Sequence, residues 1–378
     1  MPVSRVSPSL ASPAPSATRA IARRLRALVR ASRGRTRRGR WFRPVTALAL
    51  AAGTVALAAA ASAGPSVRVE QKQADPRFVD HGIAAQVAEC RGIVAAHTQD
   101  GRDLVLANTS DMSPRGYVLI TDIRSGRTDQ LYCPEGVANS PPYAAILASN
   151  GRFYTAQGPV LLELDPATAS WRFHGVPSPD AAAYLAFTEG PDGRIWAASV
   201  YGTVLVSFDP ASRLMTDHGR LDPEEQYVFD LAVDDTGWVY AGVGTARGDI
   251  VAYNPFTGEL RGVVPEPERT HESGVVYPTI DGAAVGKAAG RTYRLLGGVA
   301  REIDPAQAPA RRDVGDIYWS QGTARFPDGT RVVAYDLPDR WLEVVDAGAA
   351  ERRRIEFDYA SGGVSITSLG EGPAAMVY

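Results

Sequence analysis

The sequence predicts an all-β protein built by repeating one four-stranded unit, and three observations predict it. The first is a recurring turn, since "LLELDPATAS", "LVSFDPASRL" and "IVAYNPFTGE" are close copies of one another. The second is a companion turn of the "PDG" kind that precedes each copy. The third is that short, alternating apolar segments such as "RIWAAS" and "TVLVSF" lie between the turns, as β-strands do between hairpin turns.

The two turns repeat at nearly constant spacing. Turns of the Asp-Pro type occur at Asp122, Asp165, Asp209, Asn254, Asp304 and Asp346. Successive gaps are 43, 44, 45, 50 and 42 residues. The companion turns end at Gly101, Gly151, Gly193, Gly237, Gly282 and Gly329. In such a turn the Asp side chain caps the backbone, and the φ of the proline itself is fixed at about −65°. Each unit is therefore predicted as two hairpins in series.

Four antiparallel strands in a unit of this length are typical of one blade of a β-propeller. A single blade cannot bury both of its faces, whereas blades stacked in a ring can. Six units begin near residues 92, 142, 182, 226, 274 and 319. The fold class predicted is therefore an all-β propeller occupying one domain, residues 64–378.

A seventh blade is predicted to be shared between the two ends of this domain. The final segment "VSITSLGEGPAAMVY" matches the first two strands of a unit, and residues 66–83 align without gaps on a third and fourth strand. Pairing the two segments closes the ring without an exposed strand edge. We therefore expect seven four-stranded blades with a two-plus-two closure between the N- and C-terminal strands. The alternative is a truncated chain, which leaves the blade count open.

Residues 1–63 have the composition of an export signal. Residues 1–43 carry twelve arginines and no acid, and residues 44–63 carry no charge and end in Ala61-Ser62-Ala63. This is the order of a basic n-region, an apolar h-region and a small-residue cleavage site. The pair Arg37-Arg38 resembles a twin-arginine signal. We expect an exported protein, periplasmic or extracellular; the alternative is a retained anchor, since the apolar run is nearly long enough to span a membrane.

The rest of the chain is acidic and contains two cysteines. Residues 64–378 hold 28 basic and 42 acidic side chains, which argues against nucleic acid or an anionic membrane as a partner. Cys90 and Cys133 are a candidate disulfide in an oxidising compartment. Two buried thiols are the alternative. No Cys/His spacing indicates zinc.

The segment "GPDGRIWAAS" is followed by "FDPAS", and the segment "DDTGWVYAG" is followed by "YNPFTGE". Through these segments the sequence resembles the propeller superfamily of NHL-repeat proteins, streptogramin lyase and gluconolactonase-type enzymes. The resemblance covers nearly all of residues 66–378 and lies in turn residues, so it implies fold rather than activity. For a lyase it implies a histidine base with a divalent cation, and His271 is the position resembling that arrangement. For a lactonase it implies a metal held by acids and an asparagine, for which Glu225, Asn139 and Asp180 lie in suitable loops.

Ligands of propellers usually meet the face opposite the two turns, where blades are joined. Tyr184 and Tyr227 are predicted to begin equivalent inner strands on this face. Tyr201 and Arg247 lie in matching loops between second and third strands. Aromatic rings with one arginine suit a sugar or a carboxylated ring; plain packing is the alternative.

Two polar loops supply the other candidates. His271 lies in "PEPERTHESGVVY", beside Arg269, and a histidine among carboxylates can act as a general base. Glu225 lies in "DPEEQY", where adjacent acids raise one another's pKa if they are held close. Solvated loops are the alternative for both. His81, His174 and His218 share one repeat position and are predicted to belong to the blade, and His97 falls beside a glycine turn.

We therefore predict an exported propeller that binds a carbohydrate, small-molecule or protein ligand on its inter-blade loop face at the central channel. The ligand-binding candidates are Tyr184, Tyr201, Tyr227 and Arg269. The alternative is a lyase or lactonase acting on a carbohydrate-like or cyclic ester substrate. Its catalytic candidates are His271 as base with Glu225 and Arg247, and a divalent cation is its candidate cofactor.

Overall fold

A computed structural model describes residues 88–312 and 325–363. Within these ranges the regular structure consists of strands β1 to β23 and two short 3-10 helices. The helices are η1 (Glu266–Glu268) and η2 (Pro305–Gln307). In this part of the chain no helix is long and apolar enough to cross a membrane. The export signal predicted for residues 1–63 lies outside the described residues.

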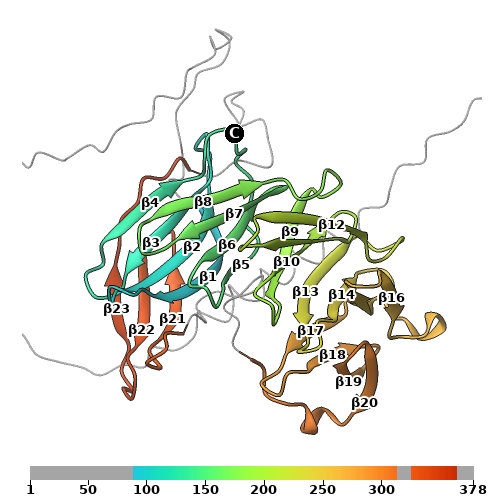
Figure 1. Ribbon diagram of the computed structural model, residues 1–378. Helices are drawn as coiled ribbons and strands as arrows, with labels where there is room; N and C mark the ends of the chain where they lie inside the picture. The colour runs from blue at the N-terminus through green and yellow to red at the C-terminus, as the bar shows by residue number, and fades with distance from the viewer. Residues whose placement is uncertain (1–87, 313–324, 364–378) are drawn as a thin grey trace, which may run out of the picture. The chain divides into compact units, whose positions relative to one another are not determined.

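The strands form antiparallel sheets in chain order (Figure 1). The first sheet contains β1 (Glu89–His97), β2 (Asp103–Ser110), β3 (Tyr117–Asp122) and β4 (Thr128–Tyr132). The second contains β5 (Ala145–Leu147), β6 (Phe153–Gln157), β7 (Val160–Asp165) and β8 (Ser170–Gly175). The third contains β9 (Ala183–Glu189), β10 (Ile195–Val200), β11 (Val204–Asp209) and β12 (Leu214–Arg220).

The fourth sheet contains β13 (Tyr227–Val233), β14 (Val239–Gly244), β15 (Asp249–Asn254) and β16 (Glu259–Gly262). One residue pair, Val200–Tyr227, joins its backbone to that of the third sheet. The fifth contains β17 (Val275–Pro278), β18 (Ala284–Ala288), β19 (Arg291–Leu296) and β20 (Val299–Ile303). The sixth contains β21 (Arg331–Asp336), β22 (Trp341–Val345) and β23 (Arg353–Glu356), and its predicted first strand falls largely on residues outside the described ranges.

The repeated four-stranded unit predicted from the turns is therefore present. The glycines that end the six companion turns all have φ between 73° and 94°, a region that a side chain disfavours. At Asp122, Asp165, Asp209 and Asn254 the side-chain Oδ1 accepts the backbone N–H two residues on, at 2.9–3.0 Å. We call the edge of each sheet that carries these turns the turn side, and the opposite edge the loop side.

Asp304 does not make the turn predicted for it. The hairpin between β19 and β20 turns at Gly297 and Gly298, with φ of 61° and 74°. Asp304 follows β20 and instead caps η2, accepting the Ala306 N–H at 2.9 Å. The unusually long gap of 50 residues before Asp304 reflects this shift, because the Asp-Pro pair lies one strand further along the unit.

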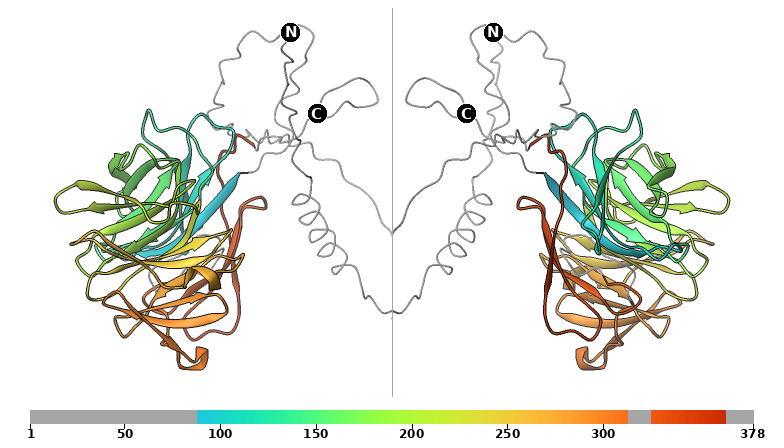
Figure 2. Two further views of the ribbon diagram at one scale, coloured as in Figure 1. Left: turned by 90° about the vertical axis from the view of Figure 1, so that its right-hand side faces the viewer. Right: turned by 90° about the vertical axis from the view of Figure 1, so that its left-hand side faces the viewer.

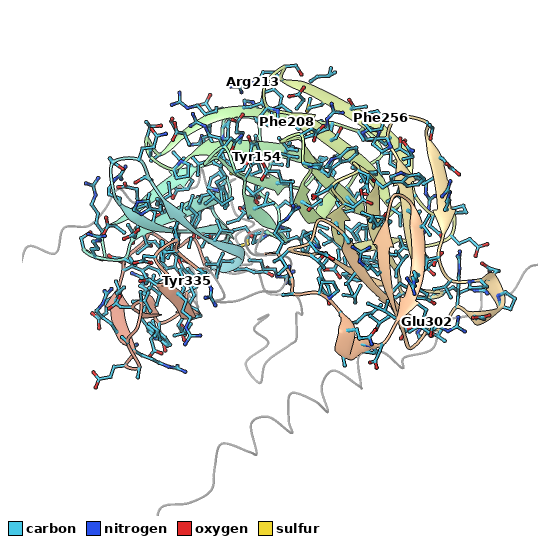
Figure 3. All side chains as sticks on the ribbon, turned by 60° about the horizontal axis from the view of Figure 1, so that its bottom comes forward. Tyr154, Phe208, Arg213, Phe256, Glu302 and Tyr335 are labelled. Carbon is cyan, nitrogen blue, oxygen red and sulfur yellow. The ribbon has the colours of Figure 1, made fainter. Side chains whose placement is uncertain are left out.

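From the first sheet to the fifth, consecutive sheets pack face to face and share a hydrophobic cluster. One such cluster joins the second and third sheets, where the rings of Tyr154 and Phe208 lie 6.2 Å apart (Figure 3). Others join the first sheet to the second, the third to the fourth, and the fourth to the fifth. Burying a large side chain in this way contributes about 2–3 kcal/mol, so stability comes from sheet-to-sheet contact.

The sixth sheet packs directly on the first (Figures 1 and 2). The rings of Tyr117 and Tyr359 lie 6.4 Å apart across this contact, and Arg353 donates to the Ile123 carbonyl at 2.8 Å. A seventh blade was expected between these two sheets. The segments predicted to form it, 66–83 and 364–378, lie outside the described residues, so the seven-blade count and the two-plus-two closure are not confirmed.

The candidate disulfide between Cys90 and Cys133 is not formed, and both thiols are free. Cys90 packs beside the cluster shared by the first and sixth sheets, whereas Cys133 lies in a separate small cluster with Val137 and Leu162. Burial raises the pKa of each thiol to about 12. The structure therefore contains two free thiols, of which Cys133 is buried and Cys90 is partly buried.

Candidate functional site

Four aromatic side chains gather on the loop side of the second, third and fourth sheets. We call Tyr143, Tyr201, Tyr227 and Phe229 the aromatic group. The ring centroid of Tyr227 lies 5.7 Å from that of Tyr201 and 5.4 Å from that of Phe229, which is nearly parallel to it at 6°. Tyr143, Tyr227 and Phe229 pack on a small buried cluster of Ala183, Leu185 and Val200. The structure thus brings together Tyr201 and Tyr227, two of the ligand-binding candidates.

The backbone holds Tyr201 in an unusual conformation. Its φ is 61°, in the left-handed region that costs a residue with a side chain about 1–2 kcal/mol. Its N–H donates to the Gln226 carbonyl at 2.6 Å, and the side chain is 63% exposed. Partial burial and the neighbouring Tyr201 hydroxyl together raise the pKa of Tyr227. A strained residue that presents a large ring to solvent is a common feature of binding sites.

Tyr184 does not join the aromatic group. The inner strand β9 carries a bulge, because Tyr184 pairs with Ser199 whereas Ala186 pairs with Ala198. The matching bulge of β13 lies between Val228 and Asp230. Tyr184 is therefore the counterpart of Val228 and points into the core, only 1% exposed. The counterpart of Tyr227 is Ala183, one residue away from the position predicted.

An acid and an arginine next to the aromatic group were not predicted. Asp230 follows Phe229 on β13, and burial raises the pKa of its carboxyl to about 6, against the opposing charge of Arg311. The Arg91 guanidinium lies 5.2 Å from the centroid of the Tyr143 ring. In the sequence, Asp230 could have been recognised as a candidate because it is an acid within the otherwise apolar strand "YVFDLAV".

The predicted catalytic residues lie around one loop, between β14 and β15. Both Glu225 carboxylate oxygens accept backbone N–H groups of this loop, from Ala246 at 3.1 Å and Arg247 at 2.5 Å. The Arg247 guanidinium pairs instead with Glu266 at 2.9 Å. The exposed His271 ring has Nδ1 3.4 Å from the Ala246 carbonyl oxygen. Glu225 is 4% exposed and holds the loop. The side chains of Glu225, Arg247 and His271 make no hydrogen bond or ion pair with one another in the described structure.

Arg269 lies in a cleft of about 430 Å³ beside this loop. We call it the Arg269 cleft. Its lining consists of Leu221, Asp222, Pro223, Glu224, Asp249, Val251, Leu260, Gly262, Glu266 and Arg269. The guanidinium lies 2.6 Å from Asp249, 3.3 Å from Glu266 and 3.6 Å from Asp222. Burial raises the pKa of Asp249, while backbone N–H groups and Arg269 oppose the shift.

The residues proposed for a divalent metal do not converge. In the described ranges no group of three or more His, Cys, Asp and Glu side chains is placed to hold a metal ion. Asn139 donates its amide to the carbonyls of Asp111 and Ser113, at 2.5 and 2.7 Å. Asp180 is exposed, and Glu225 is engaged by backbone N–H groups. This set therefore does not fit a metal centre.

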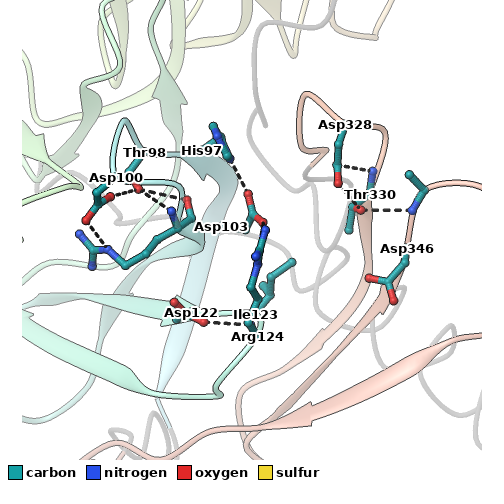
Figure 4. Close-up of polar contacts among 12 residues, drawn as sticks. His97, Thr98, Asp100, Asp103, Asp122, Ile123, Arg124, Asp328, Thr330 and Asp346 are labelled. Atoms are coloured by element: carbon teal, nitrogen blue, oxygen red, sulfur yellow. Dashed lines mark hydrogen bonds and ion pairs between the residues drawn. The ribbon is translucent and has the colours of Figure 1, made fainter.

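Three of the remaining histidines lie in strands. His218 on β12 is held by Ser207 at 2.9 Å and Tyr253 at 3.1 Å, and burial lowers its pKa to about 4. It belongs to the blade, as predicted. On the turn side, His97 contacts Asp103 at 2.6 Å, and Arg124 contacts the same carboxylate at 2.8 Å (Figure 4). His174 is exposed on β8, and His81 lies outside the described residues.

No protein-family model matches the sequence, and no curated protein sequence matches it. Among solved structures the chain is similar to streptogramin B lyase, at 14% identity over 78% of this chain and 91% of that chain, with a TM-score of 0.44. It is similar to virginiamycin B lyase from Staphylococcus aureus, at 13% identity over 73% and 87%, with a TM-score of 0.45.

A third similar structure is YCF48 solved with a bound peptide, at 12% identity over 72% of this chain and 79% of that chain, with a TM-score of 0.39. At this level of identity and overlap the comparisons carry no argument about activity. The order and pairing of the strands described above remain the basis of the fold assignment. The chain resembles, in its repeated four-stranded sheets, the β-propeller proteins that include streptogramin lyase.

Proposed function

We propose that the protein binds a ligand containing a sugar, or another ring with an apolar face, on the loop side through the aromatic group. The observation that carries the proposal is the exposed Tyr201 ring, fixed beside Tyr227, which in turn stacks on Phe229. Rigid aromatic rings offer a large apolar contact at a low cost in side-chain entropy. Stacking on such a surface suits the apolar face of a sugar.

Polar groups next to the rings support a specific orientation of the ligand. Ligand sites combine apolar walls with a few polar groups that fix the ligand. Here Asp230 follows Phe229 on β13 and feels the charge of Arg311, and Arg91 lies over Tyr143. A carbohydrate, which has both apolar faces and hydroxyl groups, fits this mixture better than a purely apolar ligand or a protein surface.

The proposal places this site in an exported protein. Residues 1–63 are the signal, removed after Ala63, and the site lies at the loop face of the central channel. The propeller has seven blades, closed by strands from residues 66–83 and 364–378. Support for these parts comes from the sequence alone: the basic and apolar runs before Ala63, and the match of the two end segments to half a unit each.

A thermal-shift screen of the full chain against uronic sugars, neutral oligosaccharides and lactones tests the proposal, because a ligand of the native state raises the unfolding midpoint. We expect Tyr201→Ala to weaken binding of the best ligand about tenfold, the effect of losing one stacked ring. The control is Phe256→Ala, since Phe256 is 84% exposed at a turn on the opposite side (Figure 3). Equal affinities for wild type and Tyr201→Ala would refute the site.

Lyase or lactonase activity is the second candidate function. Two observations favour it: His271 is exposed beside the Ala246–Arg247 backbone, and Asp230 has a carboxyl pKa of about 6, suited to proton transfer near neutral pH. Assays of β-elimination and lactone hydrolysis test it. Activity lost in both His271→Ala and Asp230→Asn supports an acid–base pair, and turnover unchanged in both variants overturns it.

A further inference from the structure

We propose that the Arg269 cleft binds an organic cation, an alkylammonium or guanidinium group carried on an aliphatic stem. The cleft lies between residues 221–224, which lead into β13, and residues 262–269, which follow β16. Its volume of about 430 Å³ is in the usual range of small-molecule sites, about 300–1,000 Å³. The inference is independent of ligand binding at the aromatic group.

The walls of the cleft suit an aliphatic stem. Leu221, Pro223, Val251 and Leu260 contribute apolar surface to the lining. Leu221 and Val251 are buried, whereas Leu260 remains 46% exposed at the edge. A chain of a few methylene groups that covers this surface gains about 0.8 kcal/mol for each methylene buried.

Arg269 does not suit an anionic ligand, because three carboxylates already surround its guanidinium. Its Nη2 pairs with Asp249 at 2.6 Å, and its Nε donates to the Val264 carbonyl at 3.2 Å. Its Nη1 lies between Glu266 and Asp222, at 3.3 and 3.6 Å. A guanidinium carries five donors in a fixed fork and cannot rotate some of them toward a ligand without breaking these contacts.

The carboxylates left over give the cleft its negative charge. Asp249 is fully buried and is neutralised by Arg269, and Glu266 pairs with Arg247. The Glu224 side chain has no hydrogen bond or ion pair with any residue the structure describes. Glu224 thus has no ion pair among the described residues, and Asp222 has only the 3.6 Å contact to Arg269, so the four lining acids outnumber the two arginines that contact them.

Asp222 points to a ligand most directly. Its side chain is only 8% exposed. One oxygen, Oδ1, accepts the N–H groups of Glu224 and Glu225 at 2.8 and 2.9 Å. The other, Oδ2, accepts no hydrogen bond from the described residues and has only the long contact to Arg269. This oxygen therefore keeps the capacity to accept a hydrogen bond, and a cation entering the cleft would supply a donor for it.

Alkylammonium and guanidinium groups come from two sources, free amines and the Lys or Arg side chains of a protein. Calorimetric titration of the full chain at low salt uses 1,5-diaminopentane for the first source and Nα-acetyl-lysine methylamide for the second. Pentanoate, an anion with a similar stem, is the control ligand. We expect both cations to bind more tightly than pentanoate, and the tighter of the two identifies the source. Because the attraction is screened over about 10 Å at 0.1 M salt, affinity falls as NaCl is added.

Glu224→Gln removes one charge from an exposed position, so it leaves the fold intact. We expect it to weaken cation binding about three- to tenfold, the effect of a partly exposed charge pair. The matched control is Glu259→Gln, an exposed acid on β16 that pairs with Arg261 away from the cleft. Tyr201→Ala is expected to leave cation binding unchanged, which separates this inference from the proposed function. Equal binding of pentanoate, or a Glu224→Gln chain that binds as wild type does, would overturn it.

Discussion

At the scale of single residues, buried polar groups in the strands differ in whether they have partners. The Tyr240 hydroxyl donates to Asp234 at 2.7 Å and accepts the Gly298 N–H at 2.9 Å, so it ties the fourth sheet to the fifth. The Tyr184 hydroxyl is equally deep but has no hydrogen-bond partner among the described residues. A buried polar group without a partner costs about 1–3 kcal/mol, so the two tyrosines make opposite contributions.

Replacing each of these tyrosines by phenylalanine tests this difference. We expect Tyr184→Phe to raise the free energy of unfolding by about 1 kcal/mol, because it removes an unpaired hydroxyl. We expect Tyr240→Phe to lower it by about 1–2 kcal/mol, because Asp234 and Gly298 lose a partner. Urea denaturation of both variants beside wild type measures the two changes. A loss of stability in Tyr184→Phe would mean that its hydroxyl is hydrogen-bonded in solution.

At the scale of strands and turns, backbone geometry decides which side chains reach the loop side. The bulges of β9 and β13 insert Leu185 and Phe229 next to their strand ends. Side chains alternate between the faces of a strand, so one extra residue moves every earlier side chain to the other face. Because the two bulges lie at matching positions, Ala183 corresponds to Tyr227. Tyr184 was predicted at the binding face because it was matched to Tyr227 one residue out of register, and it lies in the core.

The glycine turns offer a clean test at this scale. Gly193 has φ of 77°, and a Cβ added to it would have nothing within 4 Å. Gly193→Ala therefore changes only backbone conformational energy, and we expect it to lower the free energy of unfolding by about 1 kcal/mol. Chemical denaturation measures the change. Unaltered stability would contradict the left-handed turn conformation at this position.

At the scale of the whole molecule, stability depends on contacts between sheets that are distant in the sequence. The sixth sheet covers the first through a cluster that includes Tyr117, Leu119, Leu342 and Tyr359. Gln130 and Ala360 exchange two hydrogen bonds of 2.9 Å across the same contact. Units of this kind are stabilised mainly by their neighbours, so we expect these two sheets to unfold together.

Tyr359→Ala tests this coupling. Tyr359 is 5% exposed, and removing its ring is expected to lower the free energy of unfolding by about 3–5 kcal/mol. Hydrogen exchange is the informative measurement, because protection should fall in β1–β4 as well as in β21–β23. Loss of protection confined to β21–β23 would show that the first sheet does not depend on this contact.

The sequence by itself determined the repeated sheet: its period, the positive φ of its glycine turns, and the aspartate caps. These features depend on residues adjacent in the chain, so local chemistry is enough to predict them. Counting strands also predicted that Tyr201 and Tyr227 lie in segments of the loop side. Only the tertiary structure decided that their rings lie 5.7 Å apart, that Glu225 holds a loop, and that Arg269 lies among three carboxylates whereas Glu224 has no ion pair among the described residues. These outcomes depend on distances between segments far apart in the chain and on burial, which a one-dimensional pattern does not contain.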